Sequence, residues 1–144
     1  MEKTIFEGEG IFKLIPQRPP MVMIDKVLTQ SEIVVSTCLT IEKDNIFVDN
    51  GELRESGIVE HIAQSAAAMT GYSTFLHGKE PVLGFIGEVK KCYFFKLPEV
   101  GDTLETKLEV IGEAAGVTLL NANTQIVGTE QKVAECQMKI FLKQ

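Results

Sequence analysis

Apolar and polar residues alternate in several segments of the chain, and this pattern predicts β-strands that each bury one face. The alternation runs through 33–41, 104–110, 118–126 and 134–142. Because these segments are half polar and are separated by short turns, we expect an antiparallel sheet with one face in water. Two more apolar segments, 21–28 and 82–95, predict further strands, and Gly84 and Gly87 in the second predict bulges or a close backbone approach.

One long segment lacks this alternation and predicts a helix. Residues 57–76 read GIVEHIAQSAAAMTGYSTFL, are rich in alanine and glycine, and carry Glu60 and His61 as their only charged or imidazole side chains. Small side chains let other backbone approach closely, so we expect this helix to be buried against the sheet. Ser56 is the expected N-cap, and His77-Gly78 is expected to end the helix.

The predicted sheet needs a cover for its apolar face, and the predicted helix supplies it. The fold class that follows is α+β, with an antiparallel β-sheet wrapped around one long central helix, which is the hot-dog fold. Neither a repeat nor a low-complexity tract nor a linker interrupts the pattern, so we expect residues 1–144 to form a single domain.

Composition and charge exclude several classes of function. The chain is 44% hydrophobic and 24% charged, as in ordinary soluble proteins. A net charge of −6 and the lack of a basic stripe argue against binding to nucleic acid. No apolar run approaches the roughly 20 residues of a membrane span, and the N-terminal residues do not resemble a signal peptide. We therefore expect a cytoplasmic protein without a membrane partner.

The sequence also lacks the usual ligands of cofactors and metals. The three cysteines are widely spaced and form no CxxC motif, so buried thiols are expected instead of disulfides or a zinc site. The isolated Gly8 and Gly10 do not make a dinucleotide fingerprint. Neither a phosphate loop nor a nucleophilic triad is found. We accordingly expect no cofactor and no metal.

The predicted helix carries most of the candidate chemistry. A carboxylate such as Glu60 is costly to bury unless it is hydrogen-bonded, neutral or used, although the helix dipole alone favours an acid near a helix start. His61 points about 100° away from Glu60, which favours a packed or partner-facing histidine. Gln64 lies one turn after Glu60 and either orients that carboxylate, binds a hydroxyl, or attaches the helix to the sheet. Gly57 either presents backbone N–H groups to a substrate carbonyl or leaves steric room.

Three motifs of the chain resemble those of a known family. Residues 14–27, LIPQRPPMVMIDKV, resemble an opening that runs leucine-proline-histidine-arginine, an apolar stretch, then aspartate, arginine and valine. Residues 60–64, EHIAQ, are similar to the glutamate-alanine-methionine-alanine-glutamine of that family's central helix, and Gly101-Asp102 matches its glycine-aspartate turn before a late strand. In order and spacing the three motifs resemble the FabZ-type 3-hydroxyacyl-[acyl-carrier-protein] dehydratases, and the resemblance covers nearly the whole chain.

The resemblance implies a hot-dog fold that dimerises by joining two sheets edge to edge. It further implies an acyl-thioester tunnel at the dimer interface, with a site built from a histidine of one subunit and a glutamate of the other. Glu60 matches the glutamate, and its pKa should be raised if dimerisation buries it. Gln17 occupies the histidine position, where a carboxamide cannot take a proton. The family's glycine-histidine-phenylalanine-proline segment before the helix is also missing.

Three functions remain open at this point. The first is a dehydratase-like lyase of fatty-acid or polyene biosynthesis, which eliminates water to give an enoyl thioester. The second is a hot-dog thioesterase in which Glu60 activates water. The third is a non-catalytic protein that binds acyl chains. The opening 14–27 favours the first over the second, whereas Gln17 favours the third over the first.

We rank the dehydratase first and assign its residues accordingly. Glu60 and Gln17 are the predicted catalytic residues, and Gly57, His61 and Gln64 are predicted to bind substrate. The expected partners are an acyl-carrier protein or coenzyme A thioester and a second copy of the chain, in a homodimer or a higher homo-oligomer. Neither the acyl chain length nor the choice between the two carriers is predicted.

Overall fold

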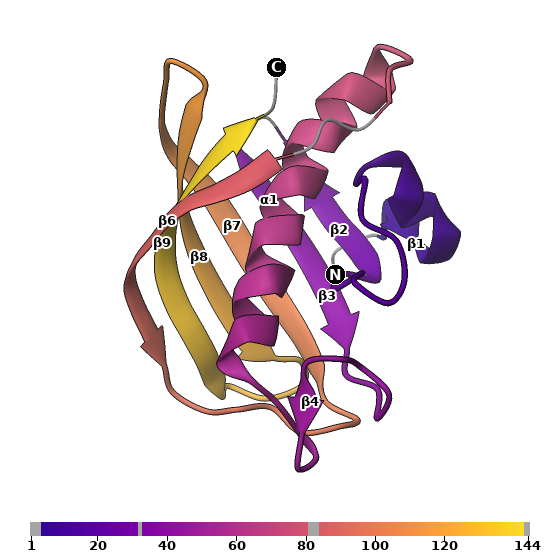
Figure 1. Cartoon of the computed structure of the whole chain (residues 1–144), viewed down its shortest axis with the longest axis vertical. Coiled ribbons are helices and arrows are strands. Elements are labelled where there is room, and N and C mark those ends of the chain that lie inside the picture. Colours follow the sequence, from indigo (N-terminus) through magenta and orange to yellow (C-terminus); the bar gives the residue numbers. More distant parts are fainter. Residues whose placement is uncertain (1–3, 32, 81–83, 143–144) are drawn as a thin grey trace.

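A large antiparallel sheet wraps around one long helix, α1 (Glu55–Leu76), in the computed structural model of the chain (Figure 1). The structure describes residues 4–31, 33–80 and 84–142. The sheet has seven strands in the order β1-β2-β3-β7-β8-β9-β6. Their bounds are β1 Phe6–Glu7, β2 Lys26–Gln30, β3 Val34–Thr40, β6 Gly84–Phe94, β7 Thr103–Ala114, β8 Val117–Ile126 and β9 Lys132–Leu142. The predicted α+β hot-dog architecture is confirmed.

Two small elements flank this frame. A 3-10 helix, η1 (Gly8–Lys13), follows β1, and a two-stranded hairpin of β4 (Val48–Asp49) and β5 (Glu52–Leu53) leads into α1. Because the hairpin delivers the chain directly to the helix, α1 begins two residues earlier than the sequence predicted. Arg54 is the N-cap residue, and its carbonyl oxygen accepts hydrogen bonds from Gly57 N at 2.9 Å and Ile58 N at 3.2 Å. The predicted cap at Ser56 is therefore wrong.

One stripe of α1 is buried against the sheet. Its apolar members recur at helical spacing, namely Ile58, Ile62, Ala66 and Met69. They belong to the same core cluster as inward-facing side chains of the sheet, among them Leu39, Leu104, Leu108, Leu120 and Met138. The strands thus bury the apolar face that their alternation predicted, and the opposite face of the helix is left for other contacts.

An irregular stretch between η1 and β2 passes across α1, and we call residues 14–25 the crossing segment. Its Leu14 lies against Gly71 of the helix so closely that a Cβ added to Gly71 would stand 1.8 Å from the Leu14 carbonyl oxygen. Only glycine permits this contact. The small residues of the predicted helix therefore do admit backbone, as expected, and one of them fixes how near the crossing segment lies.

Strand β6 forms one edge of the sheet and is hydrogen-bonded to β9 alone among the described strands. Register shifts interrupt this pairing between Ile86 and Glu88 and between Lys90 and Tyr93. A Cβ on Gly87 would stand 1.8 Å from the Phe141 ring, so the predicted bulge and close approach at this glycine are confirmed. Residues 82 and 83 of the predicted strand lie outside the described residues. Large apolar side chains on β6 are exposed, namely Phe85, Ile86, Val89, Tyr93 and Phe94.

Candidate active site

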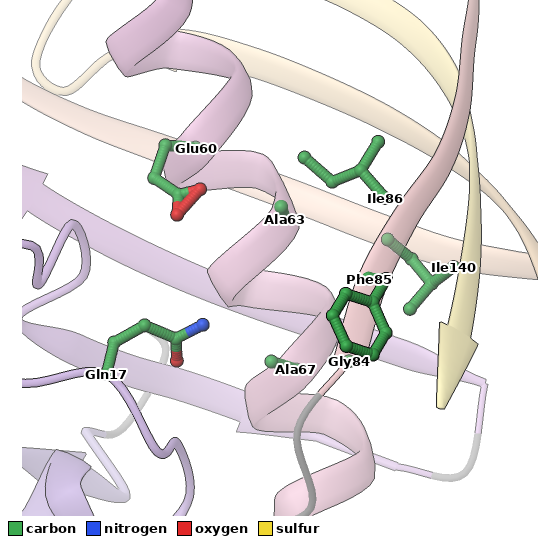
Figure 2. Close-up of a pocket in the computed structure, with 8 residues that line it drawn as sticks. All are labelled: Gln17, Glu60, Ala63, Ala67, Gly84, Phe85, Ile86 and Ile140. Carbon is green, nitrogen blue, oxygen red and sulfur yellow. The ribbon is translucent and has the colours of Figure 1, made fainter. Parts of the chain in front are cut away.

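A cavity of about 230 Å³ lies between α1, the crossing segment and the start of β6 (Figure 2). Its lining residues come from four elements and are Gln17, Glu60, Ala63, Ala67, Gly84, Phe85, Ile86 and Ile140. Figure 2 shows the carboxyl group of Glu60 and the amide of Gln17 pointing into the space between the helix and the crossing segment. The two residues predicted to be catalytic therefore meet in one pocket.

Both of these residues belong to the same chain. The family resemblance implied that the two positions would face each other from different subunits, but Gln17 and Glu60 line one cavity within a single chain. The crossing segment makes this possible because it lies along α1, held near one end by the Leu14–Gly71 contact. The two residues therefore line the same cavity within one chain, and a site shared between two subunits stays a prediction.

Glu60 is half-buried at the mouth of the pocket. Burial removes water from its carboxylate and raises the pKa of the carboxyl group, while a hydrogen bond from Gln64 partly lowers it. The Gln64 Nε2 atom donates to Glu60 Oε1 across 3.4 Å. The sequence predicted this direction for the pKa of Glu60, but the burial arises within the chain itself. A raised pKa makes the carboxylate a stronger base, so this group is suited to taking and returning a proton.

Gln17 offers a hydrogen-bond acceptor that the protein itself does not use. Its Oε1 atom is buried and has no partner among the described residues. The neighbouring Arg18 holds the loop in place, since its guanidinium donates to the carbonyl oxygens of Ile15 and Gln17 at 2.8 Å and stacks over Phe12 at 4.6 Å. A buried acceptor without a donor costs free energy, so the placement of Gln17 is not explained by hydrogen bonding within the described residues.

Gln64 does not line the pocket, but its side chain contacts Glu60, which does. Its side chain is 1% exposed and is fixed at both ends by the crossing segment. Oε1 accepts a hydrogen bond from Met23 N at 2.6 Å, and Nε2 donates to Met21 O at 2.7 Å. Of the roles foreseen for Gln64, orienting the Glu60 carboxylate is therefore the one its contacts support.

His61 faces the sheet, away from the pocket. It is completely buried, with Nδ1 2.7 Å from Met23 O and Nε2 2.8 Å from Thr106 Oγ1, which in turn lies 2.6 Å from Thr124 Oγ1. A carbonyl oxygen only accepts, so Nδ1 carries the proton and Nε2 accepts from Thr106. Burial lowers the pKa of His61 to about 4. The structure does not bring this predicted substrate-binding residue to the cavity.

Gly57 is likewise absent from the pocket lining. A Cβ at this position would stand 2.6 Å from Phe47 Cβ and 2.7 Å from Leu53 Cδ1, so the glycine leaves room for the hairpin before α1. Its backbone N–H already bonds to Arg54 O within the first turn. The contacts thus favour the steric interpretation of Gly57 over the oxyanion one.

Apart from its two polar residues, the pocket is apolar. Ala63 and Ala67 follow Glu60 at helical spacing and form one wall, and Phe85, Ile86 and Ile140 form the facing wall. The sequence analysis did not assign these five. Spacing from Glu60 could have indicated the two alanines, but the facing wall depends on how β6 curves over the helix, which no local pattern reveals.

The described residues contain neither a cluster of metal-binding side chains nor a helix that could cross a membrane. Within ranges 4–31, 33–80 and 84–142, no group of three or more His, Cys, Asp or Glu side chains is placed to hold a metal ion. In the same part of the chain, no helix is long and apolar enough to cross a membrane.

Known proteins share this arrangement of sheet and helix. The dehydratase heterocomplex ApeI:P from Xenorhabdus doucetiae superposes with a TM-score of 0.84, covering 93% of this chain and 91% of that one at 16% identity. A hypothetical thioesterase protein from Streptococcus pneumoniae, solved with coenzyme A, superposes less well, with a TM-score of 0.63 over 81% of this chain and 84% of that one at 10% identity. These likenesses show the fold.

Sequence relatives extend over the whole chain. The 3-hydroxyacyl-[acyl-carrier-protein] dehydratase FabZ of Staphylococcus saprophyticus is 28% identical, covering 98% of both chains. FabZ of Staphylococcus aureus is 26% identical over 98% of this chain and 97% of its own length. Fold and relatives together define a hot-dog protein of the dehydratase type, as the motifs predicted. The family model described as ApeP dehydratase matches residues 10–144, and the chain belongs to this ApeP-like family.

Proposed function

We propose that this protein eliminates water from a 3-hydroxyacyl thioester to give the enoyl thioester. The observation that carries the proposal is that Glu60, whose pKa is raised, and the Gln17 amide line one otherwise apolar pocket. The polar mouth suits the hydroxyl and thioester groups, and the apolar walls suit an acyl chain. Relatives named as dehydratases of this type support the same reaction.

The elimination needs a base at C2 and an acid at C3. Among the described residues that line the pocket, Glu60 is the one that gains or loses a proton in the ordinary pH range. Its carboxylate takes the C2 proton, and the electrons of the C–H bond form the C2=C3 double bond. The carboxylic acid so formed returns the proton to the C3 oxygen, which leaves as water. The Gln17 amide lines the same cavity and is proposed to hydrogen-bond the substrate, so that the C3 hydroxyl is held near Glu60.

We further propose that the pocket is closed by a second chain on the β6 edge. Phe85 and Ile86 line the cavity and are 52% and 42% exposed, so a partner that pairs with β6 would cover both. A second copy of this chain is the partner we expect, because an exposed apolar edge strand can pair with its own copy around a two-fold axis. A related structure is a heterocomplex, so a different chain is the competing outcome. Mass measurement of the purified native assembly separates the two.

Product analysis tests the reaction. The protein is incubated with 3-hydroxyacyl groups carried on acyl-carrier protein and on coenzyme A, and products are identified by mass spectrometry. We expect enoyl thioester, preferentially from acyl-carrier protein because the relatives are named for that carrier. Glu60→Gln should reduce the rate by about 10²–10⁴-fold, the usual worth of a general acid–base.

Glu55→Gln is the matched control. Glu55 lies on the same helix but is exposed and lies 3.5 Å from Arg54, so its loss should leave the rate unchanged. Release of free thiol without loss of water would identify a thioesterase instead. Substrate binding without any product, in an assembly of verified mass, would identify an acyl-binding protein and overturn the proposal.

A further inference from the structure

Gln64 connects the two halves of the pocket without touching its interior. Its Nε2 atom carries two hydrogens, one directed to Met21 O at 2.7 Å and one to Glu60 Oε1 at 3.4 Å. Its Oε1 atom accepts from Met23 N at 2.6 Å, and this bond fixes which way round the amide lies, because a backbone N–H cannot pair with an NH₂ group. The amide therefore presents a donor to Glu60 in its only satisfied orientation.

The same amide also anchors the segment that carries Gln17. Met21 and Met23 belong to the crossing segment, four and six residues after Gln17 in the sequence. Gln64 binds this segment from α1, and the Leu14–Gly71 contact fixes its other end. Gln17 thus lies between two fixed points, and the spacing between Gln17 and Glu60 depends on both of them.

We propose that Gln64 is a positioning residue, which orients the Glu60 carboxylate for proton transfer and sets the distance across the pocket to Gln17. It is not a substrate-binding residue, because its side chain is only 1% exposed and lies outside the cavity. The catalytic role of Gln64 rests on the proposed function. The hydrogen bond by which Gln64 stabilises the ionised form of Glu60 does not depend on that function.

Two variants remove the donor in different ways. Gln64→Met keeps the length of the side chain and loses all three hydrogen bonds. Gln64→Leu also loses all three, with a shorter apolar side chain that brings no new charge next to Glu60. Without the N–H donor the carboxylate of Glu60 is less stabilised, so the pKa of Glu60 should rise by about half to one unit in either variant. Gln64→Leu serves as the test if Gln64→Met does not fold.

His61→Gln is the control for mere loosening of the crossing segment. It removes the ring that hydrogen-bonds to Met23 O, yet His61 makes no hydrogen bond to Glu60 among the described contacts. If Gln64 only holds the crossing segment in place, His61→Gln should shift the pKa of Glu60 as the Gln64 variants do. If Gln64 orients the Glu60 carboxylate, the pKa of Glu60 should stay unchanged in His61→Gln.

The readout is the titration of the Glu60 carboxyl carbon by ¹³C NMR, assigned with Glu60→Gln, together with the pH profile of kcat. We expect the titration midpoint and the acid limb of kcat to move to higher pH in the Gln64 variants, with KM changed less than about twofold. An unchanged midpoint in both variants would overturn the proposal. A shifted midpoint in a protein that forms no enoyl product would instead overturn the proposed function and leave the role of Gln64 standing.

Discussion

Glu60 and His61 are neighbours in the sequence but occupy opposite environments. Glu60 is half-buried at the mouth of a pocket and has one long hydrogen bond, at 3.4 Å. His61 is completely buried and has a partner within 2.8 Å on each ring nitrogen. Each residue of an α-helix rotates the side-chain direction by about 100°, so Glu60 and His61 point to different sides of α1.

The difference separates a residue poised for chemistry from one that holds the fold. Buried polar groups normally find partners, so a complete network such as that of His61 is what structural stability alone requires. A carboxyl group with a raised pKa beside the unpartnered acceptor of Gln17 is not accounted for in that way. Position in the cavity lining, together with hydrogen-bond partners, therefore distinguishes these two neighbours on the helix.

The largest expected effect on stability is at His61. His61→Ala leaves Met23 O and Thr106 Oγ1 without their partner and opens a cavity, so it should lower the free energy of unfolding by about 3 kcal/mol. Glu60→Gln should not lower it, because the amide avoids the cost of burying a charge. Urea unfolding at neutral pH measures both. A greater loss for Glu60→Gln than for His61→Ala would contradict the comparison.

A smaller effect should appear with pH. The pKa of His61 is about 4 in the folded chain against an ordinary 6.5, so between these values the unfolded chain takes up a proton that the folded one refuses. The free energy of unfolding therefore falls as pH falls from about 6.5 toward 4, by about 2 kcal/mol at pH 5 from this residue. The raised pKa of Glu60 acts in the opposite direction. The folded chain binds a proton at Glu60 more readily than the unfolded chain does, so this residue alone would raise the free energy of unfolding as pH falls.

A double difference isolates the histidine. Unfolding of the wild type and of His61→Gln is measured at pH 7.5 and at pH 5, and the other titrating groups cancel. We expect the wild type to lose about 2 kcal/mol more than the variant over this interval. Equal losses would mean that the imidazole is not held neutral by burial.

The smallest expected effect on stability is at the hydroxyl pair of Ser65 and Thr37, next to His61. Ser65 Oγ donates to His61 O at 2.7 Å and lies 2.6 Å from Thr37 Oγ1, and both hydroxyl groups are buried. Ser65→Ala leaves the Thr37 hydroxyl without this partner and should cost about 1 kcal/mol in thermal or chemical unfolding. The rate of product formation should stay within twofold of wild type. A larger loss of activity would show that the sheet side of α1 also takes part in catalysis.

The sequence predicted the frame of the molecule well because local pattern determines it. Alternation marked the strands, and the alanine-rich run marked the helix to its last residue, Leu76. The N-cap was misplaced because the β4–β5 hairpin, and not the local preference of Ser56, decides where α1 begins. Hairpin geometry of this kind depends on pairing with Glu99, far along the chain.

The site was predictable only in part. Glu60 stood out as the carboxylate of an apolar helix, and Gln17 was reached by resemblance. The two residues share a pocket because of the path of the crossing segment. Gly71 and Gln64 fix this path through contacts with residues more than 40 positions away in the sequence. The partners of His61 at Thr106 and Thr124 are equally remote, so its isolation from the pocket could not be inferred.

The contact between Gly71 and Leu14 makes the width of the pocket adjustable from a distance. Gly71 lies about three turns along α1 from Glu60, and the single atom it lacks determines how near the crossing segment can come. Gly71→Ala would act as a wedge, displacing Leu14 and with it the base of the segment that carries Gln17. The position of Gln17 relative to Glu60 thus depends on a backbone contact outside the cavity, at a residue that touches neither of them.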